Sequence, residues 1–352
     1  MENELKGKVQ TVLGLVEPTR LGFTLPHEHL FIDVRGNFVE PSDVRHKKHM
    51  NEPVNFENLY WVRNNRLYSR DNLVLDNERT AIKEVLLFKE IGGSTIVEVT
   101  PNNCGRNPVG MLNVARATGL NIIMGTAYYT ESNMGPETDS MTEVNFADEF
   151  IKDITIGVGK EHIKAGIIGE VGCSWPLGKK EKKVLRAAAL AQQKTGAAIS
   201  IHPGFNEKAP FEIVDILTDA GAKPERIVIG HITLAFPSEA HTIRVELAKR
   251  GCYLAWDQFG INGIYPLEPS PYNIANEVTS IDEIINLVGE GYLDRILISH
   301  DTGNKILLSS YGGSGFLLIP EVIIPLMLNR GLTQDQIQTL TIENPRRALT
   351  FS

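Results

Sequence analysis

The feature that most constrains the fold is a short run of β-branched residues that recurs along the chain. Each run is followed by turn-forming or polar residues and then by a longer segment with helical spacing. This alternation predicts parallel strands joined by helices. Eight such units in 352 residues predict an α/β fold of the (β/α)8 TIM-barrel type, with a doubly wound sheet as the alternative. The expected strands lie within residues 21–30, 94–100, 121–128, 164–172, 197–204, 226–232, 252–260 and 295–303.

Two segments depart from this period, residues 35–70 and residues 129–145, and we expect both to be long loops inserted at the rim of the barrel. The first segment contains His46 and His49, which we interpret as part of a solvated loop rather than as a metal site. The chain shows neither an internal repeat nor a linker. We therefore expect residues 1–352 to form a single domain.

Composition excludes several classes of protein. Lys and Arg number 35 against 43 Asp and Glu, a formal charge of −8, which argues against a nucleic-acid binder. The most apolar stretch, residues 316–328, contains Pro320, Glu321 and Pro325 and is shorter than the ~20 residues of a membrane-spanning helix. The charged N-terminal segment lacks the pattern of a secretory signal, and the three cysteines lack metal-site spacing. We expect a cytoplasmic protein without a membrane partner.

Histidines and carboxylates gather at the predicted carboxyl ends of the strands, where barrel enzymes carry their active sites. His27 and His29 are two residues apart, so on an extended strand they project to the same side. His300 and Asp301 are adjacent, so one of them faces inward. We choose Asp301, because a carboxylate can both bind metal and accept a proton. The six predicted ligands are His27, His29, Glu170, His202, His231 and Asp301.

Six nitrogen and oxygen donors suit two divalent ions. Imidazole and carboxylate without thiolate favour zinc, with manganese and iron as alternatives. A carboxylate is expected to bridge two cations that lie ~3.5 to 4 Å apart, and Glu170 is our choice for it. Asp301 is the predicted catalytic residue, because a carboxylate at this place could take a proton from water and return it to a leaving group.

The same motifs, in the same order, resemble the phosphotriesterase family of the amidohydrolase superfamily, from one end of the chain to the other. The resemblance implies a binuclear metal centre held by the six residues named above. Glu170 stands where organophosphate-degrading members carry a carboxylated lysine, and Gln258 stands where they carry a histidine on strand seven. The matching segments are LGFTLPHEHL, KAGIIGEVG, SIHPG, VIGHI, LISHD, YGGSGFLLIPEVIIPLMLNRGL and TIENPRRALTF.

Within the family the resemblance is greatest to a branch of amidases. It implies hydrolysis of N-acyl taurines, chiefly N-acetyltaurine, to taurine and a carboxylate. Two alternatives stay open: a lactonase or phosphotriesterase that uses the same metals, and a catalytically silent metal-binding scaffold. The expected partner is a small-molecule substrate, and the resemblance also favours a homodimer.

The substrate pocket is predicted from topology alone, from residues that follow the strands at the open end of the barrel. They are Asn102, Arg106, Tyr128, Asn206 and Trp256. A sulfonate would need a cation or several hydrogen-bond donors in this acidic protein. The cationic candidates near strand ends are Arg35, Arg106, Lys208 and Lys305.

Overall fold

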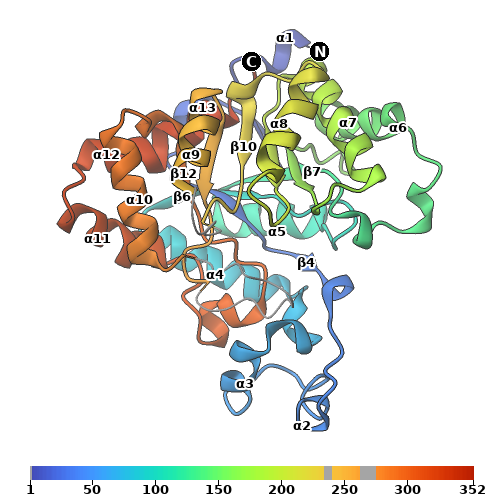
Figure 1. Ribbon diagram of the computed structural model, residues 1–352, viewed down its shortest axis with the longest axis vertical. Coiled ribbons are helices and arrows are strands. Elements are labelled where there is room, and N and C mark those ends of the chain that lie inside the picture. The colour runs from blue at the N-terminus through green and yellow to red at the C-terminus, as the bar shows by residue number, and fades with distance from the viewer. Residues whose placement is uncertain (1, 234–239, 262–274) are drawn as a thin grey trace.

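A computed structural model describes residues 2–233, 240–261 and 275–352. Its central sheet has eight strands, and each pairs in parallel with the next one along the chain (Figure 1). This sequential order confirms the predicted barrel and excludes a doubly wound sheet, whose strand order would reverse. The strands are β3 (Phe23–Glu28), β6 (Gly93–Glu98), β7 (Asn121–Thr126), β8 (Ile167–Gly172), β9 (Ile199–His202), β10 (Ile227–Ile229), β11 (Tyr253–Trp256) and β12 (Ile296–Ile298).

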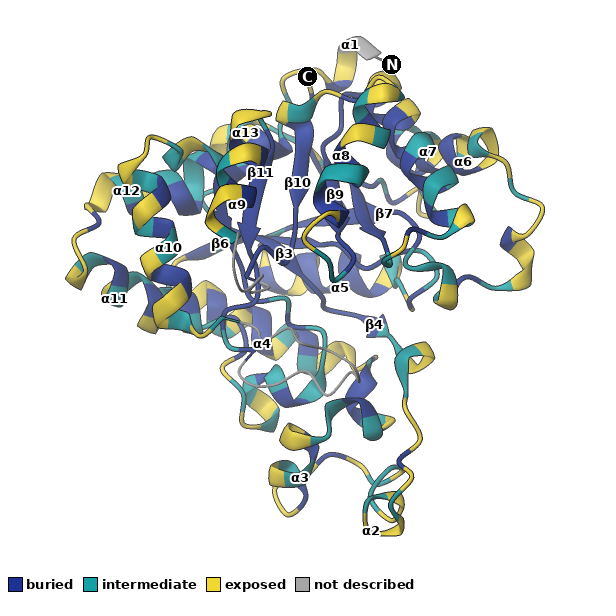
Figure 2. Cartoon of the chain, in the orientation of Figure 1, coloured by how far each residue is buried: buried dark blue, intermediate teal, exposed yellow. Residues whose placement is uncertain are grey.

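Helices surround the sheet, with their exposed residues turned outward and the strands buried inside (Figure 2). α7 (Lys179–Thr195) is capped at its C-terminus by Gly196, whose φ of 74° is a left-handed conformation that glycine adopts without steric cost. The helices beside the strands are α4 (Glu78–Glu90), α5 (Pro108–Thr118), α6 (Glu143–Thr155), α7 (Lys179–Thr195), α8 (Ala209–Asp219), α9 (Ala240–Lys249) and α10 (Glu277–Gly289). Shorter helices are α1 (Glu2–Leu5), α11 (Ile324–Asn329), α12 (Gln334–Gln338) and α13 (Asn344–Leu349).

Side-chain alternation divides the core into two layers. On β10, Ile227 and Ile229 belong to the large cluster packed against the helices, whereas Val228 lies in a separate cluster inside the barrel. That inner cluster also contains Ala348 of α13, so the C-terminal helix helps to fill the barrel. None of the helices in the described ranges combines the length and the apolar character that crossing a bilayer requires. All three cysteines are buried and free.

The segment 35–70 is more ordered than the loop we expected. It contains the short helices α2 (Val44–Lys47) and α3 (Leu59–Asn64), and an antiparallel pair, β4 (Ile32–Asp33) with β5 (Val74–Leu75), brackets it. The resulting lobe extends away from the chain termini (Figure 1). Local contacts explain this order, since the indole of Trp61 donates to His46 Nδ1 at 2.7 Å and His49 Nδ1 lies 2.6 Å from Glu52. The second segment, 129–145, forms two 3-10 turns before α6 begins.

The first and last strands, β3 and β12, stand at the two ends of the sheet order, and the side chain of Glu28 joins them. Its Oε1 accepts hydrogen bonds from the Ser299 hydroxyl at 2.8 Å and from the backbone N–H and Nδ1 of His300 at 2.9 and 2.8 Å. Its Oε2 accepts from the backbone N–H of Thr302 at 3.1 Å. A single buried carboxylate therefore makes four bonds across the seam of the barrel.

The Glu28 seam predicts a stability that depends on pH. Burial alone would raise the pKa of Glu28, but His300 and the hydrogen bonds of the seam outweigh it, so the pKa lies below 4.5. A lowered folded-state pKa contributes stability that is present above the unfolded value and is lost as the pH falls through the folded value. We expect Glu28→Gln to lower the free energy of unfolding at pH 7 by about 3 kcal/mol, measured by urea denaturation.

The difference between Glu28→Gln and the unmodified protein should shrink as the pH is taken below 4.5. The exposed Glu57 offers a matched control, since Glu57→Gln should change the free energy by less than about 0.5 kcal/mol. Equal unfolding free energies for the two variants at pH 7 would show that the seam does not depend on this carboxylate.

Candidate metal centre

The six predicted ligands lie at one end of the barrel because parallel strands bring their carboxyl ends to the same edge. His27, Glu170 and His202 lie within the last three residues of β3, β8 and β9. The other three follow a strand by one to three residues: His29 follows β3, His231 follows β10 and Asp301 follows β12. We call this end of the barrel the mouth.

A first trio consists of His27, His29 and Glu170, whose ligand atoms all lie within 4.8 Å of one another. His27 Nε2 is 3.5 Å from Glu170 Oε1. Asp301 adjoins this trio, with its Oδ1 3.1 Å from His29 Nε2 and 3.7 Å from His27 Nε2. These four side chains together offer imidazole nitrogens and carboxylate oxygens to one small volume.

A second trio consists of Glu170, His202 and His231 and meets the same 4.8 Å criterion. Glu170 Oε1 lies 2.9 Å from His231 Nε2 and 3.2 Å from His202 Nδ1. Glu170 is therefore common to both trios. One carboxylate placed between two groups of histidines is the arrangement that a bridging ligand requires.

Asp257 is the residue of the centre that sequence reasoning missed. Its Oδ2 is 3.1 Å from His27 Nδ1, and its Oδ1 is 3.0 Å from His231 Nδ1. We predicted its neighbour Trp256 as a pocket residue, whereas the structure buries the indole completely in the layer against the helices, 5.7 Å from the guanidinium of Arg244. Alternation along β11 could have found Asp257, since Tyr253 and Ala255 face the barrel interior.

The electrostatics of the centre suit a cation. Burial alone would lower the pKa of His27, but Asp257 and Glu170 outweigh it and raise the pKa to about 9. Burial would raise the pKa of Glu170 and of Asp257, but the neighbouring imidazoles outweigh it and hold the pKa of each carboxyl group below its ordinary value. Within the described part of the chain, neither buried ring nitrogen of His27 has a hydrogen-bond partner, and Asp257 Oδ2 has none either. Buried negative charge beside a free imidazole nitrogen fits divalent metal binding.

His29 is oriented by a separate chain of hydrogen bonds. Its Nδ1 lies 2.8 Å from the hydroxyl of Thr100, which donates to Glu98 Oε1 at 2.7 Å. Because the Thr100 hydroxyl donates its hydrogen to Glu98, its oxygen accepts a hydrogen bond from His29 Nδ1. Nε2 of His29 is thus directed toward the mouth, where it lies 3.1 Å from Asp301 Oδ1. Glu98 is completely buried, and this burial raises its pKa.

Two residues of the centre have left-handed backbone conformations, His231 with φ 51° and Asp301 with φ 55°. Among the described residues, His162 is the one other non-glycine residue with positive φ. Such a conformation costs about 1–2 kcal/mol for an L-residue and is concentrated at functional sites. The backbone bends at both strand ends and turns these side chains toward the centre.

The other side chains predicted to line the pocket have partners elsewhere. Arg106 pairs with Asp153 of α6 at 2.9 Å and donates to the carbonyl of Gly125, so its guanidinium is held beneath the rim. Asn102 and Tyr128 both donate to Glu149 of α6, at 2.6 and 3.1 Å. The structure thus directs these three predicted residues toward α6 rather than toward the metal ligands.

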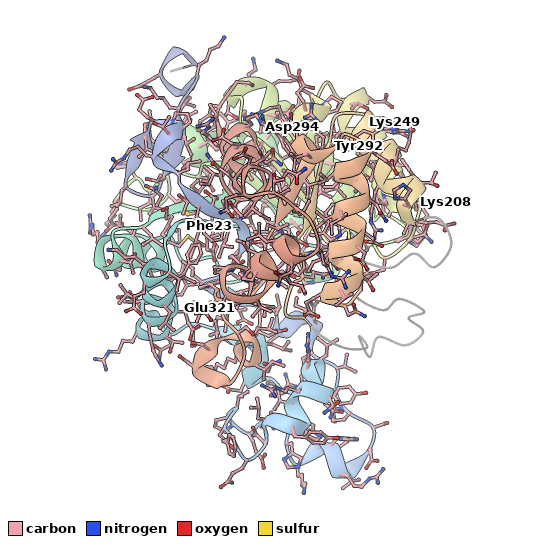
Figure 3. The ribbon with its side chains drawn as sticks, turned by 90° about the vertical axis from the view of Figure 1, so that its left-hand side faces the viewer. Phe23, Lys208, Lys249, Tyr292, Asp294 and Glu321 are labelled. Carbon is pink, nitrogen blue, oxygen red and sulfur yellow. The ribbon has the colours of Figure 1, made fainter. Side chains whose placement is uncertain are left out.

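Asn206 forms a turn before α8, where its side-chain oxygen accepts from the backbone N–H of Lys208. Lys208 itself is exposed at the edge of the molecule (Figure 3). Tyr129, the residue after the predicted Tyr128, reaches the centre instead. Its hydroxyl lies 3.3 Å from His202 Nδ1, and its ring meets the imidazole edge-on.

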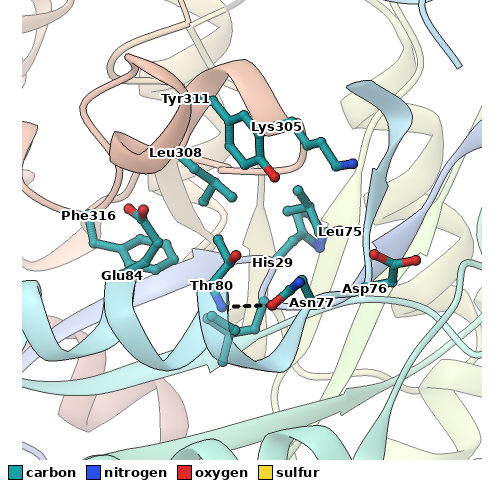
Figure 4. Close-up of a pocket in the computed structure, with 12 residues that line it drawn as sticks. His29, Leu75, Asp76, Asn77, Thr80, Glu84, Lys305, Leu308, Tyr311 and Phe316 are labelled. Atoms are coloured by element: carbon teal, nitrogen blue, oxygen red, sulfur yellow. Dashed lines mark hydrogen bonds between the residues drawn. The ribbon is translucent and has the colours of Figure 1, made fainter. Parts of the chain in front are cut away.

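A small pocket of about 20 Å³ has His29 in its wall and so adjoins the centre (Figure 4). Lys305 stands in its wall and is paired with Asp71 at 2.6 Å. Arg35, another cationic candidate, is exposed and paired with Asp33. The apolar part of the cavity wall comes from Leu30, Leu75, Ala81, Leu308 and Phe316.

Known proteins resemble this chain over nearly its full length. An N-acetyltaurine hydrolase of Dictyostelium discoideum is 41% identical over 373 aligned residues, which cover 98% of each chain. An N-acetyltaurine hydrolase of Homo sapiens is 40% identical over 351 residues, which cover 99% of each chain. The crystal structure of a resiniferatoxin-binding protein from Rhodobacter sphaeroides superposes with a TM-score of 0.93 at 31% identity and covers 97% of this chain and 95% of that one.

The family model with the description "Phosphotriesterase family" matches residues 7–349, nearly the whole chain. The match includes every strand of the barrel and all residues of the two trios. The chain belongs to the phosphotriesterase family.

Proposed function

We propose that this protein is a two-metal amidase that cleaves N-acetyltaurine and related N-acyl taurines to taurine and a carboxylate. The single observation that carries the proposal is the position of Glu170, which is shared by two trios of ligands at the mouth of the barrel. The substrate class is supported by relatives named N-acetyltaurine hydrolase, which are about 40% identical over almost the full chain.

The residues of each trio indicate which ion they would hold. His27 and His29, with Asp301, would hold one ion, and His202 and His231 would hold the other, with Glu170 between the two. The nitrogen and oxygen donors favour zinc, with manganese or iron as the alternative. A glutamate at the bridging position makes modification of a lysine by carbon dioxide unnecessary.

Two divalent ions at these positions supply Lewis acidity, which lowers the pKa of water and polarises a carbonyl oxygen. Asp301 is the most exposed of the carboxylates at the centre, with 19% of its side chain accessible against 4% for Glu170. It is therefore the group placed to accept the proton of the attacking water. The same carboxyl group can return that proton to the departing amine, because a free amide anion is too basic to leave.

One departure from the organophosphate-degrading members weakens the case for phosphotriester hydrolysis. Gln258 stands where they carry the histidine that assists the catalytic aspartate. The Gln258 carbonyl accepts a hydrogen bond from the Thr233 hydroxyl at 2.6 Å, and an amide group cannot relay a proton as an imidazole does. Asp301 is left to move protons without such a relay.

The substrate assignment is tested by product analysis. We expect the zinc-loaded protein to release taurine from N-acetyltaurine and from taurines with longer acyl chains, measured by mass spectrometry beside a panel of lactones and paraoxon. Fast turnover of a lactone with no cleavage of any N-acyl taurine would favour the lactonase alternative. A protein that binds two ions but hydrolyses none of these compounds would favour the scaffold alternative.

The role of Asp301 predicts a variant that keeps the fold and much of the metal but loses turnover. Asp301→Asn should lower kcat by about 10²- to 10⁴-fold, the usual contribution of general acid–base catalysis, since an amide cannot accept the proton. Steady-state kinetics on N-acetyltaurine and elemental analysis of the same preparation measure the two effects. The exposed Asp219 provides the control, since Asp219→Asn should keep full activity. Unchanged kcat in Asp301→Asn would remove this residue from the mechanism.

The role of Glu170 predicts loss of metal. Glu170→Ala should deplete one or both ions on elemental analysis, because the bridge that offsets the repulsion between two cations is gone. Glu207→Ala, an exposed substitution in the loop after β9, should retain the metal content of the unmodified protein. Two ions per chain in the Glu170→Ala variant would place the bridge on another residue.

A further inference from the structure

Asp257 contacts one histidine of each trio. Its Oδ2 is 3.1 Å from Nδ1 of His27, and its Oδ1 is 3.0 Å from Nδ1 of His231. Oδ1 also accepts the backbone N–H of His231 at 2.8 Å. The carboxylate is completely buried, and its contacts hold both rings from the side opposite to Glu170.

The chemistry of imidazole gives these contacts a direction. A neutral imidazole carries hydrogen on one nitrogen and a lone pair on the other, and it binds metal through the lone pair. An ionised carboxylate only accepts hydrogen bonds, so Nδ1 of His231 carries the hydrogen that it donates to Asp257 Oδ1. Nδ1 of His27 lies 3.1 Å from Asp257 Oδ2 outside hydrogen-bond geometry, and the negative charge beside it favours hydrogen on the same ring nitrogen. Nε2 of each ring faces Glu170 Oε1, at 3.5 Å for His27 and 2.9 Å for His231, and is the nitrogen left to bind a metal ion.

We infer that Asp257 is a positioning residue that fixes the tautomer and ring orientation of one ligand in each trio, and so couples the two metal positions. The inference rests on the proposed function, in which both trios hold metal. The backbone leaves room for this arrangement, because a Cβ at Gly230 would lie 3.0 Å from Asp257 Oδ2 and 2.8 Å from the carbonyl oxygen of Ile201. His29, in contrast, is oriented independently through Thr100.

Replacement of Asp257 by asparagine should affect the two trios unequally. The backbone N–H of His231 has no alternative hydrogen position and needs an acceptor, so the amide oxygen must occupy the place of Oδ1. The amide NH2 then faces Nδ1 of His27 and donates to it. His27 is forced to carry its hydrogen on Nε2, which removes the lone pair offered to the first trio. The second trio keeps its geometry.

The experiment is a zinc titration of metal-free protein against a chromophoric chelator. We expect the unmodified protein to bind two zinc ions per chain with high affinity. Asp257→Asn should keep one equivalent at the original affinity and weaken the other by about 10- to 100-fold, the usual effect of losing an orienting partner. Asp257→Ala, which removes the acceptor from both rings, should weaken both. Circular dichroism and thermal unfolding of each metal-free variant establish that it is folded.

Two further variants locate the retained ion. In the Asp257→Asn background, His202→Asn should abolish the remaining tight equivalent, whereas His29→Asn should leave it unchanged. If Asp257 only packs, Asp257→Asn should lower the melting temperature without weakening zinc binding at one site more than at the other. Unchanged affinity at both positions, or equal weakening at both, in Asp257→Asn would overturn the inference. If the unmodified protein binds no zinc, the proposed two-metal function fails instead, and the inference fails with it.

Discussion

The carboxylate of Glu28 joins the first strand of the barrel to the last, and the centre at the mouth depends on that junction. β3 leads into His27 and His29, and β12 leads into Asp301. The backbone N–H of Asp301 donates to the carbonyl of His27 at 3.3 Å, beside the bonds made by Glu28. Closure of the barrel and approach of Asp301 to the histidines are therefore one structural event. A carboxylate suits this seam because its two oxygens accept several donors at once.

Formation of the metal centre costs folding free energy, and such a cost is typical of a functional site. Glu170 and Asp257 bury negative charge, and His231 and Asp301 adopt left-handed backbone conformations. Buried charges are tolerated only when they are paired, and here the imidazoles provide the pairing. A divalent ion bound to the folded chain and not to the unfolded one would offset the cost by mass action. The apolar layers of the barrel provide the rigid frame that keeps these groups together.

The pocket predictions show where a rule of alternation stops working. β7 ends at Thr126, so Tyr128 and Tyr129 lie beyond the strand, where the chain turns and a period of two no longer applies. The prediction chose Tyr128, and the structure brings Tyr129 to His202. On β11 the period still holds, and an offset of one residue separates the outward Trp256 from the inward Asp257. The sequence alone therefore indicates that Asp257, not Trp256, faces the barrel interior.

By itself, the sequence determined the eight alternating units and the set of candidate ligands, because hydrophobic periodicity and the polar ends of strands are local properties. Only the tertiary structure decided that Glu28 joins the first strand to the last, that Asp257 contacts two histidines and that Arg106 forms an ion pair with Asp153. Each of these pairings joins segments far apart in the chain. Burial of charge requires a partner, and no local pattern tells which distant side chain provides it, since the partner is chosen by how the barrel closes and how the helices pack around it.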